Sequence, residues 1–213
     1  KEFVERVARL LSGGPAAGAM KPAAGRATAS SQPTPTDEGF RVAVLPFKCA
    51  GANADLTALA EGLSEEIVTG LSRFSYLRVI SRSSTSRYAG QAIDVRAAGK
   101  EIGARYVMEG SLRQAGAQLR VAVQLVDAAT GAHLWAETYE RPFRSEDLFA
   151  LQDDLVPRIV STVADMHGAL PRSMSDAVRN KAADQLTPYE ALLHSFGYNE
   201  HWTREALALP APE

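Results

Sequence analysis

The sequence predicts an α/β protein: a mixed sheet of about five strands with the element order βαβαβββα, helices packed on the sheet, and further helices at the carboxyl end. In the first half of the domain, short apolar runs alternate with amphipathic helical stretches, which is typical of βαβ units. In the second half, strictly alternating apolar and polar residues are separated by tight turns, which predicts antiparallel hairpins. A long helical stripe then closes the domain.

Composition narrows the class of function. The chain has 213 residues, of which 46% are hydrophobic, enough for a buried core. Its 23 basic and 25 acidic residues nearly cancel, so no global field draws it to nucleic acid, and we expect no nucleic-acid contact by this chain. The single Cys49 excludes an internal disulfide. No run of about 18 apolar residues is present, so we expect no membrane segment in this chain.

The first 37 residues are expected to lie outside the globular domain. Residues 1–11 predict a short amphipathic helix, and residues 12–37 predict a flexible linker rich in Ala, Gly, Pro and Ser. Because the start carries neither an initiating Met nor a signal peptide, we expect a piece of a longer protein. The predicted compartment is the cytoplasm, with the periplasm as the alternative if the longer protein has a membrane anchor upstream.

The α/β domain is predicted over residues 38–167. A buried strand at 41–47 ends at Pro46–Phe47 and leads into an amphipathic helix over 56–74. A second strand (76–81), a second helix (94–102) and a third strand (105–113) follow. Because crossovers through helices return the chain in the same direction, these three strands should be parallel.

The second half of the domain is predicted to be antiparallel. The run "QLRVAVQLV" and the run "HLWAETY" should form hairpins with the strands that precede them. A closing helix carries Pro157, which should kink or split it. Residues 168–213 predict a helical tail whose last helix has no evident partner within the domain, so we expect it to begin a region that continues past Glu213.

The sequence carries no catalytic motif, so neither catalytic residues nor a cofactor are predicted. Cys49 follows the first strand and could be a nucleophile, but no histidine is near it in sequence, which favours an inert loop thiol. Glu190, His194 and His201 share helical spacing and could form a metal-binding face, but Gly197 interrupts the helix. Solvated helix surface is therefore the preferred interpretation, and no metal site is predicted.

The segment "VISRSSTSRYAG" (79–90) is the candidate ligand site. It contains Arg82, Ser83, Ser84, Thr85 and Arg87, and it follows the carboxyl end of the second parallel strand, where doubly wound sheets bind ligands. Hydroxyls, backbone N–H groups and arginine forks suit a small anion or nucleotide. The alternative is structural, with the hydroxyls capping a helix and the arginines forming surface ion pairs.

The strand "HLWAETY" supplies a candidate partner surface. Alternation places His133, Trp135 and Tyr139 on one face of this strand. Such a stripe could stack on a ligand, but it more often packs against a helix or a partner. An exposed strand edge here would also permit a homodimer.

The order of motifs closely resembles the TolB amino-terminal-like domain of multidomain bacterial signalling proteins. The resemblance covers about residues 40–167. It rests on four segments: "VAVLPF" (42–47), "AEGLSEEIVTGLSRFSYLRVISRSST" (60–85), "IGARYVMEGSLRQAGAQLRVAVQLVDAATGAHLWAETYER" (102–141) and "DLFALQDDLVPRIV" (147–160). The tail "LTPYEALLHSFGYNEHWTRE" (186–205) resembles the entry to a tetratricopeptide repeat array.

The resemblance implies a non-catalytic domain. In such proteins it lies between an output or sensor domain, such as a class III adenylate cyclase, a protein kinase or a winged-helix domain, and helical repeats. The leading hypothesis is therefore a regulatory module whose partners are other domains of the same polypeptide or another protein. Two alternatives stay open: a fragment of an adenylate cyclase, and a small-anion or nucleotide sensor that binds at the carboxyl edge of the sheet.

Overall fold

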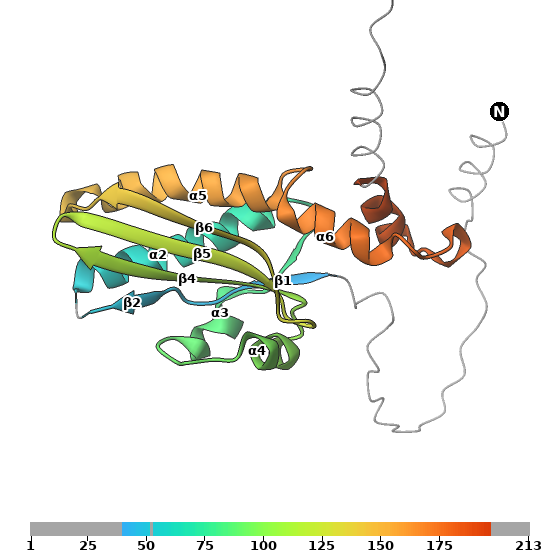
Figure 1. Ribbon diagram of the computed structural model, residues 1–213, viewed down its shortest axis with the longest axis horizontal. Helices are drawn as coiled ribbons and strands as arrows, with labels where there is room; N and C mark the ends of the chain where they lie inside the picture. The colour runs from blue at the N-terminus through green and yellow to red at the C-terminus, as the bar shows by residue number, and fades with distance from the viewer. Residues whose placement is uncertain (1–39, 52, 197–213) are drawn as a thin grey trace, which may run out of the picture. The chain divides into compact units, whose positions relative to one another are not determined.

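The computed structural model describes residues 40–51 and 53–196 (Figure 1). The chain divides into two units, Lys1–Thr34 and Pro35–Glu213, and every described residue belongs to the second. The helix predicted at 1–11, the linker predicted at 12–37 and the end of the helical tail lie outside the described residues.

A six-stranded mixed sheet forms the centre of the domain, which confirms the predicted fold class. Its main path runs β3-β1-β4-β5-β6, and β2 pairs with β4 beyond the end of β1. Pairing is parallel among β1, β3 and β4 and antiparallel from β4 through β6, as predicted. The strands are β1 (Arg41–Val44), β2 (Lys48–Ala50), β3 (Arg78–Val79), β4 (Tyr106–Ala115), β5 (Gln118–Asp127) and β6 (Ala132–Pro142).

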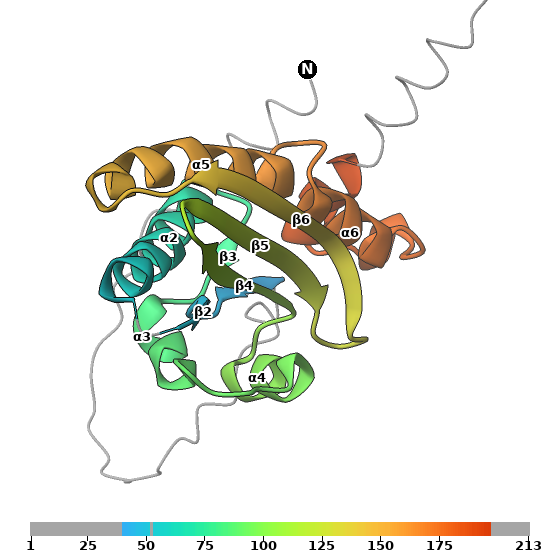
Figure 2. The same cartoon turned by 60° about the vertical axis from the view of Figure 1, so that its left-hand side comes forward.

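Helices α2 (Ala54–Ser72), α5 (Leu148–Ala164) and α6 (Ala169–Val178) cover one face of the sheet (Figure 2). The main core lies between them and the sheet and is made of fully buried aliphatic side chains such as Ile67, Met108, Leu125, Leu155 and Ile159. Burial of each such side chain stabilises the fold by about 1.5–3 kcal/mol. This layer fixes α2, which forms one wall of the candidate site.

A smaller layer covers part of the opposite face. It consists of α3 (Arg82–Thr85), the 3-10 turn η2 (Ser86–Tyr88) and α4 (Val95–Ile102), which lie below the sheet in Figure 2. Their core is mostly of small residues, among them Ala43, Ala98 and Val107. Small side chains let the short helices lie close to β1 and β4. The remainder of this face, near Ser111 and Thr138, is only partly buried or exposed.

Three details differ from the sequence prediction. The segment Lys48–Ala50, which follows the interruption at Pro46, is a short strand where a loop was expected. It is a strand because it pairs with β4. The second strand is limited to Arg78–Val79. The polar segment that follows begins with the short helix α3, for which no helix was predicted. Four of the five hydroxyl residues in 81–86 therefore lie on a short helical segment, and the fifth, Ser81, precedes it as the N-cap.

Of the two outcomes expected at Pro157, a kink or a split, the split does not occur, since α5 is one helix of 17 residues. A proline removes the hydrogen bond to the carbonyl four residues earlier, here that of Asp153. Both Asp153 and Pro157 are exposed, so water can bond to the carbonyl that the proline leaves without a partner.

The tail packs on the domain rather than extending away from it. Leu170, Met174 and Leu193 are fully buried in the main core. Residues 188–196 are helical and begin with a capping box, in which the Glu190 N–H donates to Thr187 Oγ1 (3.2 Å) and the Thr187 N–H donates to Glu190 Oε2 (3.0 Å). Within the described part of the chain, no helix combines the length and the apolar character needed to cross a bilayer.

Candidate functional site

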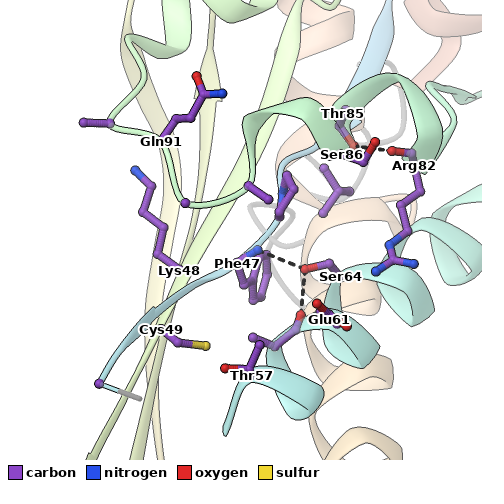
Figure 3. A pocket seen from close by; sticks show the side chains of 17 residues that line it. Phe47, Lys48, Cys49, Thr57, Glu61, Ser64, Arg82, Thr85, Ser86 and Gln91 are labelled. Atoms are coloured by element: carbon purple, nitrogen blue, oxygen red, sulfur yellow. Dashed lines mark hydrogen bonds between the residues drawn. The ribbon is translucent and has the colours of Figure 1, made fainter. Parts of the chain in front are cut away.

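A cavity of about 660 Å³ lies at the carboxyl end of β1, beside the segment that follows β3 (Figure 3). Three parts of the chain line it: the stretch from Val44 to Gly51, one face of α2, and the α3–η2 segment with the turn that follows it. This is the crevice where the sequence predicts a ligand site. Its volume falls in the range of about 300–1,000 Å³ that is usual for small-molecule sites.

Ser64 ties two walls of the cavity together. Its buried hydroxyl accepts a hydrogen bond from the Phe47 N–H (3.1 Å) and donates to the Ala60 carbonyl (2.8 Å), as the dashed lines in Figure 3 mark. Residues 45–47 link β1 to β2 and belong to neither strand. The Ser64 hydroxyl therefore satisfies the buried N–H of Phe47, which no neighbouring strand bonds. The Phe47 ring also lies against Gly110, where a Cβ atom would come within 2.7 Å of it. The wall is therefore held in place from both sides.

Cys49 lines the cavity but is not activated. Its Sγ lies 3.4 Å from the Leu56 carbonyl oxygen. Burial raises the pKa of the thiol, and the Glu61 carboxylate adds to the increase, although a hydrogen bond with Thr57 opposes it. A raised pKa disfavours the thiolate, which is the nucleophilic form. The preferred interpretation of Cys49 as an inert thiol is consistent with this geometry.

Three charged side chains line the cavity, and they differ in what they already bind. Arg82 Nη1 lies 3.1 Å from Glu65 Oε2, which makes a good ion pair. Lys48 Nζ lies 4.0 Å from Glu109 Oε2, at the limit of an ion pair, and its side chain is 45% exposed. Among the residues that the structure describes, Glu61 makes no hydrogen bond or ion pair.

The structure separates the five residues of the predicted anion site. Arg82 and Thr85 line the cavity, joined by Ser86, which the sequence reasoning did not select. Thr85 donates its hydroxyl hydrogen bond to the Arg82 carbonyl (3.1 Å), as expected of a residue inside a helical turn.

The other three residues face elsewhere. The hydroxyl oxygens of Ser83 and Ser84 lie 2.9 and 3.1 Å from that of Ser81, outside the cavity lining. Arg87 Nη1 pairs with Glu101 Oε1 of α4 at 3.1 Å. The helical course of residues 82–88 causes this separation, because successive side chains point in different directions around a helix.

The three residues of the predicted partner surface also differ in exposure. Tyr139 is buried, and its hydroxyl donates to Glu137 Oε2 (3.0 Å). Trp135 packs partly buried against the main core, whereas His133 is exposed. The strand register explains this, because a bulge shifts the pairing between Leu125–Trp135 and Val126–His133. His133 therefore leaves the face that Trp135 and Tyr139 share.

Within 40–51 and 53–196, no group of three or more His, Cys, Asp or Glu side chains is arranged so that it could hold a metal ion. Glu190 is engaged in its capping box and accepts a hydrogen bond from Lys181 Nζ (2.6 Å). His201, the third residue considered for a metal face, lies outside the described residues.

A second feature, missed at the sequence level, is a cluster of aromatic side chains where the domain begins and where its last described helix ends. We call Phe40, Tyr76, Tyr106, Tyr189 and Phe196 the terminal aromatic cluster. The Phe40 ring stacks on Tyr106 (centroids 6.0 Å apart) and lies 6.3 Å from the Tyr189 ring. The Tyr76 and Phe196 rings meet edge to face at 5.3 Å. Such pairs contribute about 0.5–1.5 kcal/mol beyond their buried area.

Hydrogen bonds and cations reinforce this cluster. The Tyr189 hydroxyl donates to the Tyr76 carbonyl (2.8 Å), and the Tyr76 hydroxyl donates to the Ala164 carbonyl at the end of α5. Burial raises the pKa of Tyr76, and the nearby Asp165 carboxylate raises it further. The Arg105 guanidinium lies 5.0 Å from the centre of the Phe40 ring. The cluster thus joins β3, β4, the end of α5 and the 188–196 helix.

One curated relative and several solved structures resemble this chain. The protein named "Putative adenylate cyclase 3" from Rhizobium meliloti (strain 1021) is 43% identical over 122 residues, which are 57% of this chain and 20% of the relative. The chain thus spans a fifth of the length of that relative.

Three solved structures are similar at low identity. The PelC dodecamer from Paraburkholderia phytofirmans is 18% identical (TM-score 0.39; 58% of this chain and 86% of that chain covered). Lipoprotein GNA1162 from Neisseria meningitidis is 16% identical (TM-score 0.41; 57% and 99%). TolB from Acinetobacter baumannii is 19% identical (TM-score 0.38; 59% and 28%).

A family model matches residues 38–158, more than half of the chain and nearly the whole predicted α/β domain. Its description is "HilA/YgeH-like transcriptional regulator, second domain". This name differs from the TolB amino-terminal-like family that the sequence resembles. Through residues 38–158, the chain belongs to the family of the second domain of HilA/YgeH-like transcriptional regulators.

Proposed function

We propose that this chain is a non-catalytic regulatory module that couples an upstream output domain to downstream helical repeats. The observation that carries the proposal is the terminal aromatic cluster. Phe40 stands where the chain enters the domain, and Tyr189 and Phe196 stand in its last described helix, yet the Phe40 and Tyr189 rings pack together. Membership of a family of transcriptional regulators supports a regulatory role.

The cluster offers a physical route for coupling. A displacement of the 188–196 helix would disturb the Tyr189 hydrogen bond to the Tyr76 carbonyl. Tyr76 lies just before β3, which pairs with β1 at the position where the chain enters the sheet. Both ends of the domain are therefore attached to the same sheet edge, and each can bias the packing of the other.

The cluster can be tested in this chain by amide hydrogen exchange. Tyr189→Ala should speed exchange at Val42 and Val79 by roughly two- to tenfold, because it removes a ring pair and a hydrogen bond. Leu192→Ala is the matched control, since Leu192 lies on the same helix and is 47% exposed. Faster exchange restricted to residues 188–196 would contradict the coupling.

The same pair of substitutions tests function in the longer protein. We expect Tyr189→Ala, but not Leu192→Ala, to change the activity of the output domain at equal protein abundance. An output that ignores both substitutions, while exchange in the cluster changes, would leave a structural cluster without a regulatory role.

A second candidate concerns the output domain. The relative named as an adenylate cyclase favours a parent that makes a cyclic nucleotide, and the family description favours a parent that binds DNA. In either case we assign the chemistry to residues outside this domain. Cyclic-nucleotide production by the isolated chain would overturn that assignment, whereas production or DNA binding by the longer protein alone would support it.

A further inference from the structure

We propose that the cavity between β2, α2 and the α3–η2 segment binds a small zwitterion, a molecule of the size and chemistry of a free amino acid. The proposal goes beyond the coupling function and does not depend on it. It also replaces the small-anion ligand expected from the sequence with a ligand of different charge.

The apolar walls of the cavity are already in place. Val44 is 2% and Phe47 is 7% exposed, so the cavity floor is part of the packed core. Phe47 is fixed by its backbone bond to Ser64 and by contact with Gly110. Ala60 on α2 and Ala89 after η2 also line the cavity, and their small side chains leave space inside it. A ligand with a short aliphatic body would therefore bind without reorganising the core, which lowers the cost of binding.

The charges of the walls select against a simple anion. Arg82, the cation expected to bind one, already pairs with Glu65 at 3.1 Å, and Ser83, Ser84 and Arg87 do not line the cavity. Glu61 does line it and has no ion-pair partner among the described residues. A carboxylate or phosphate would therefore experience repulsion from Glu61, and Arg82 would have to leave its pair with Glu65 to offset that repulsion.

Two opposite charges remain available, and they come from different elements. Lys48 extends from β2 and Glu61 from α2, and Figure 3 shows them on different sides of the cavity. The 4.0 Å contact between Lys48 and Glu109 is long and partly exposed, so turning Lys48 toward a ligand costs little. An ammonium group near Glu61 and a carboxylate near Lys48 would satisfy both, whereas a ligand with one charge would satisfy one wall and be repelled by the other.

Binding can be tested by titrating the ¹⁵N-labelled chain with L-alanine, L-leucine or L-glutamate. Butylamine, butyrate and inorganic phosphate serve as probes with a single type of charge. We expect saturable shifts of the amides of Gly51, Ser64, Gly90 and Gln91 with at least one amino acid, and affinities about tenfold or more weaker for the singly charged probes. Absence of a saturable shift with every amino acid up to about 10 mM, an affinity near the weak limit of specific binding, would overturn the proposal.

Substitutions assign the two walls. Glu61→Gln and Lys48→Met should each weaken amino-acid binding by about tenfold, the effect of losing one charge-assisted hydrogen bond. Glu66→Gln is the matched control, because Glu66 is an exposed carboxylate on α2 that does not line the cavity. The thermal midpoint of each variant establishes that it is folded, and Lys48→Met provides an independent test if Glu61→Gln is not. Phosphate binding that is tighter than amino-acid binding and is lost in Arg82→Ala would instead establish an anion site.

Discussion

At the scale of single residues, the same carboxylate can carry two interpretations until its neighbours are known. Glu190 has helical spacing to two histidines, which suggested a metal-binding face, but it also stands three residues after Thr187, the spacing of a capping box. The structure shows the capping box together with an ion pair to Lys181. The local signal Thr-x-x-Glu was present in the sequence, whereas Lys181, nine residues away, depends on a turn that no motif announces.

Glu190 should make the stability of the 188–196 helix depend on pH. The hydrogen bond from Lys181 holds the pKa of this carboxyl below its ordinary value of 4.5, with a further contribution from the Thr187 N–H. Because the folded-state pKa is depressed, the stabilisation is complete above pH 4.5 and is lost as the pH falls through the folded-state value. The Lys181 side chain is 47% exposed, so solvent screens this pair and the effect should reach at most about 1 kcal/mol.

Urea unfolding between pH 3 and 7 measures this contribution. Glu190→Gln should lower the free energy of unfolding near neutral pH, and its difference from the natural sequence should shrink toward the acid end of the range. Asp184→Asn, which changes an exposed carboxylate in the preceding turn, is the control. A difference for Glu190→Gln that stays constant with pH would show that its ionisation does not stabilise the helix.

The sequence predicts which residue types lie near the cavity, but it does not predict which of their side chains point into it. The sequence placed a polar, arginine-containing segment at the carboxyl edge of the sheet, and Arg82 and Thr85 do line the cavity there. Whether Arg87 faced the same way depended on the helical course of residues 82–88, which turns it toward Glu101. No sequence pattern marks Glu61 as a cavity residue, because the wall that faces it comes from β2, a strand that was not predicted.

At the scale of elements, periodicity predicted best where one face is buried and the other is exposed. Strand β5 alternates over most of its length, and it pairs with β4 from end to end in the register that a short turn imposes. Alternation failed at β6, because the bulge near Leu134 cannot be seen in a pattern of apolar positions. Very short strands such as β2 and β3 give too few residues for a period to be recognised.

The α4 helix depends on close packing against the sheet and the turn after β5. A Cβ atom at Gly99 would lie 2.3 Å from the Ala128 Cβ atom and 2.9 Å from the Ala104 carbonyl oxygen. Gly99→Ala should therefore destabilise the protein by about 1–3 kcal/mol through overpacking. This exceeds the gain of about 1 kcal/mol that alanine normally brings to a helix.

Thermal or urea unfolding measures the effect of Gly99→Ala. Lys100→Ala on the exposed side of the same helix serves as the control and should change the free energy of unfolding by less than about 0.5 kcal/mol. A Gly99→Ala protein as stable as the natural sequence would show that α4 can move away from the sheet at little cost, so the smaller layer would not be rigid.

At the scale of the whole molecule, no sequence pattern indicated that the tail closes the domain. Each helix of the tail has an apolar side, but amphipathicity does not say which surface that side contacts. The predicted boundary after residue 167 separated α6 and the 188–196 helix from the sheet. In the structure Leu170, Met174 and Leu193 are buried in the same core as β4 and α5.

Truncation tests whether the 188–196 helix belongs to the domain. A chain that ends at Leu186 loses the buried Leu193 and exposes Phe40 and Tyr76, which Tyr189 and Phe196 otherwise cover. Loss of this apolar packing should lower the free energy of unfolding by about 2–5 kcal/mol, the range for removing large side chains from a core. Urea unfolding followed by circular dichroism measures the loss.

A chain that ends at Phe196 is the matched control, because it keeps every contact that the described residues make within the terminal aromatic cluster. Its midpoint should equal that of the full chain. If the chain ending at Leu186 unfolds at that same midpoint, the last helix is a separate element, and the predicted boundary describes the cooperative unit better than the packing does. If only the shorter chain is destabilised, the cooperative unit extends from Phe40 to Phe196, and the helical repeats proposed to follow it would act on a helix that is part of the core.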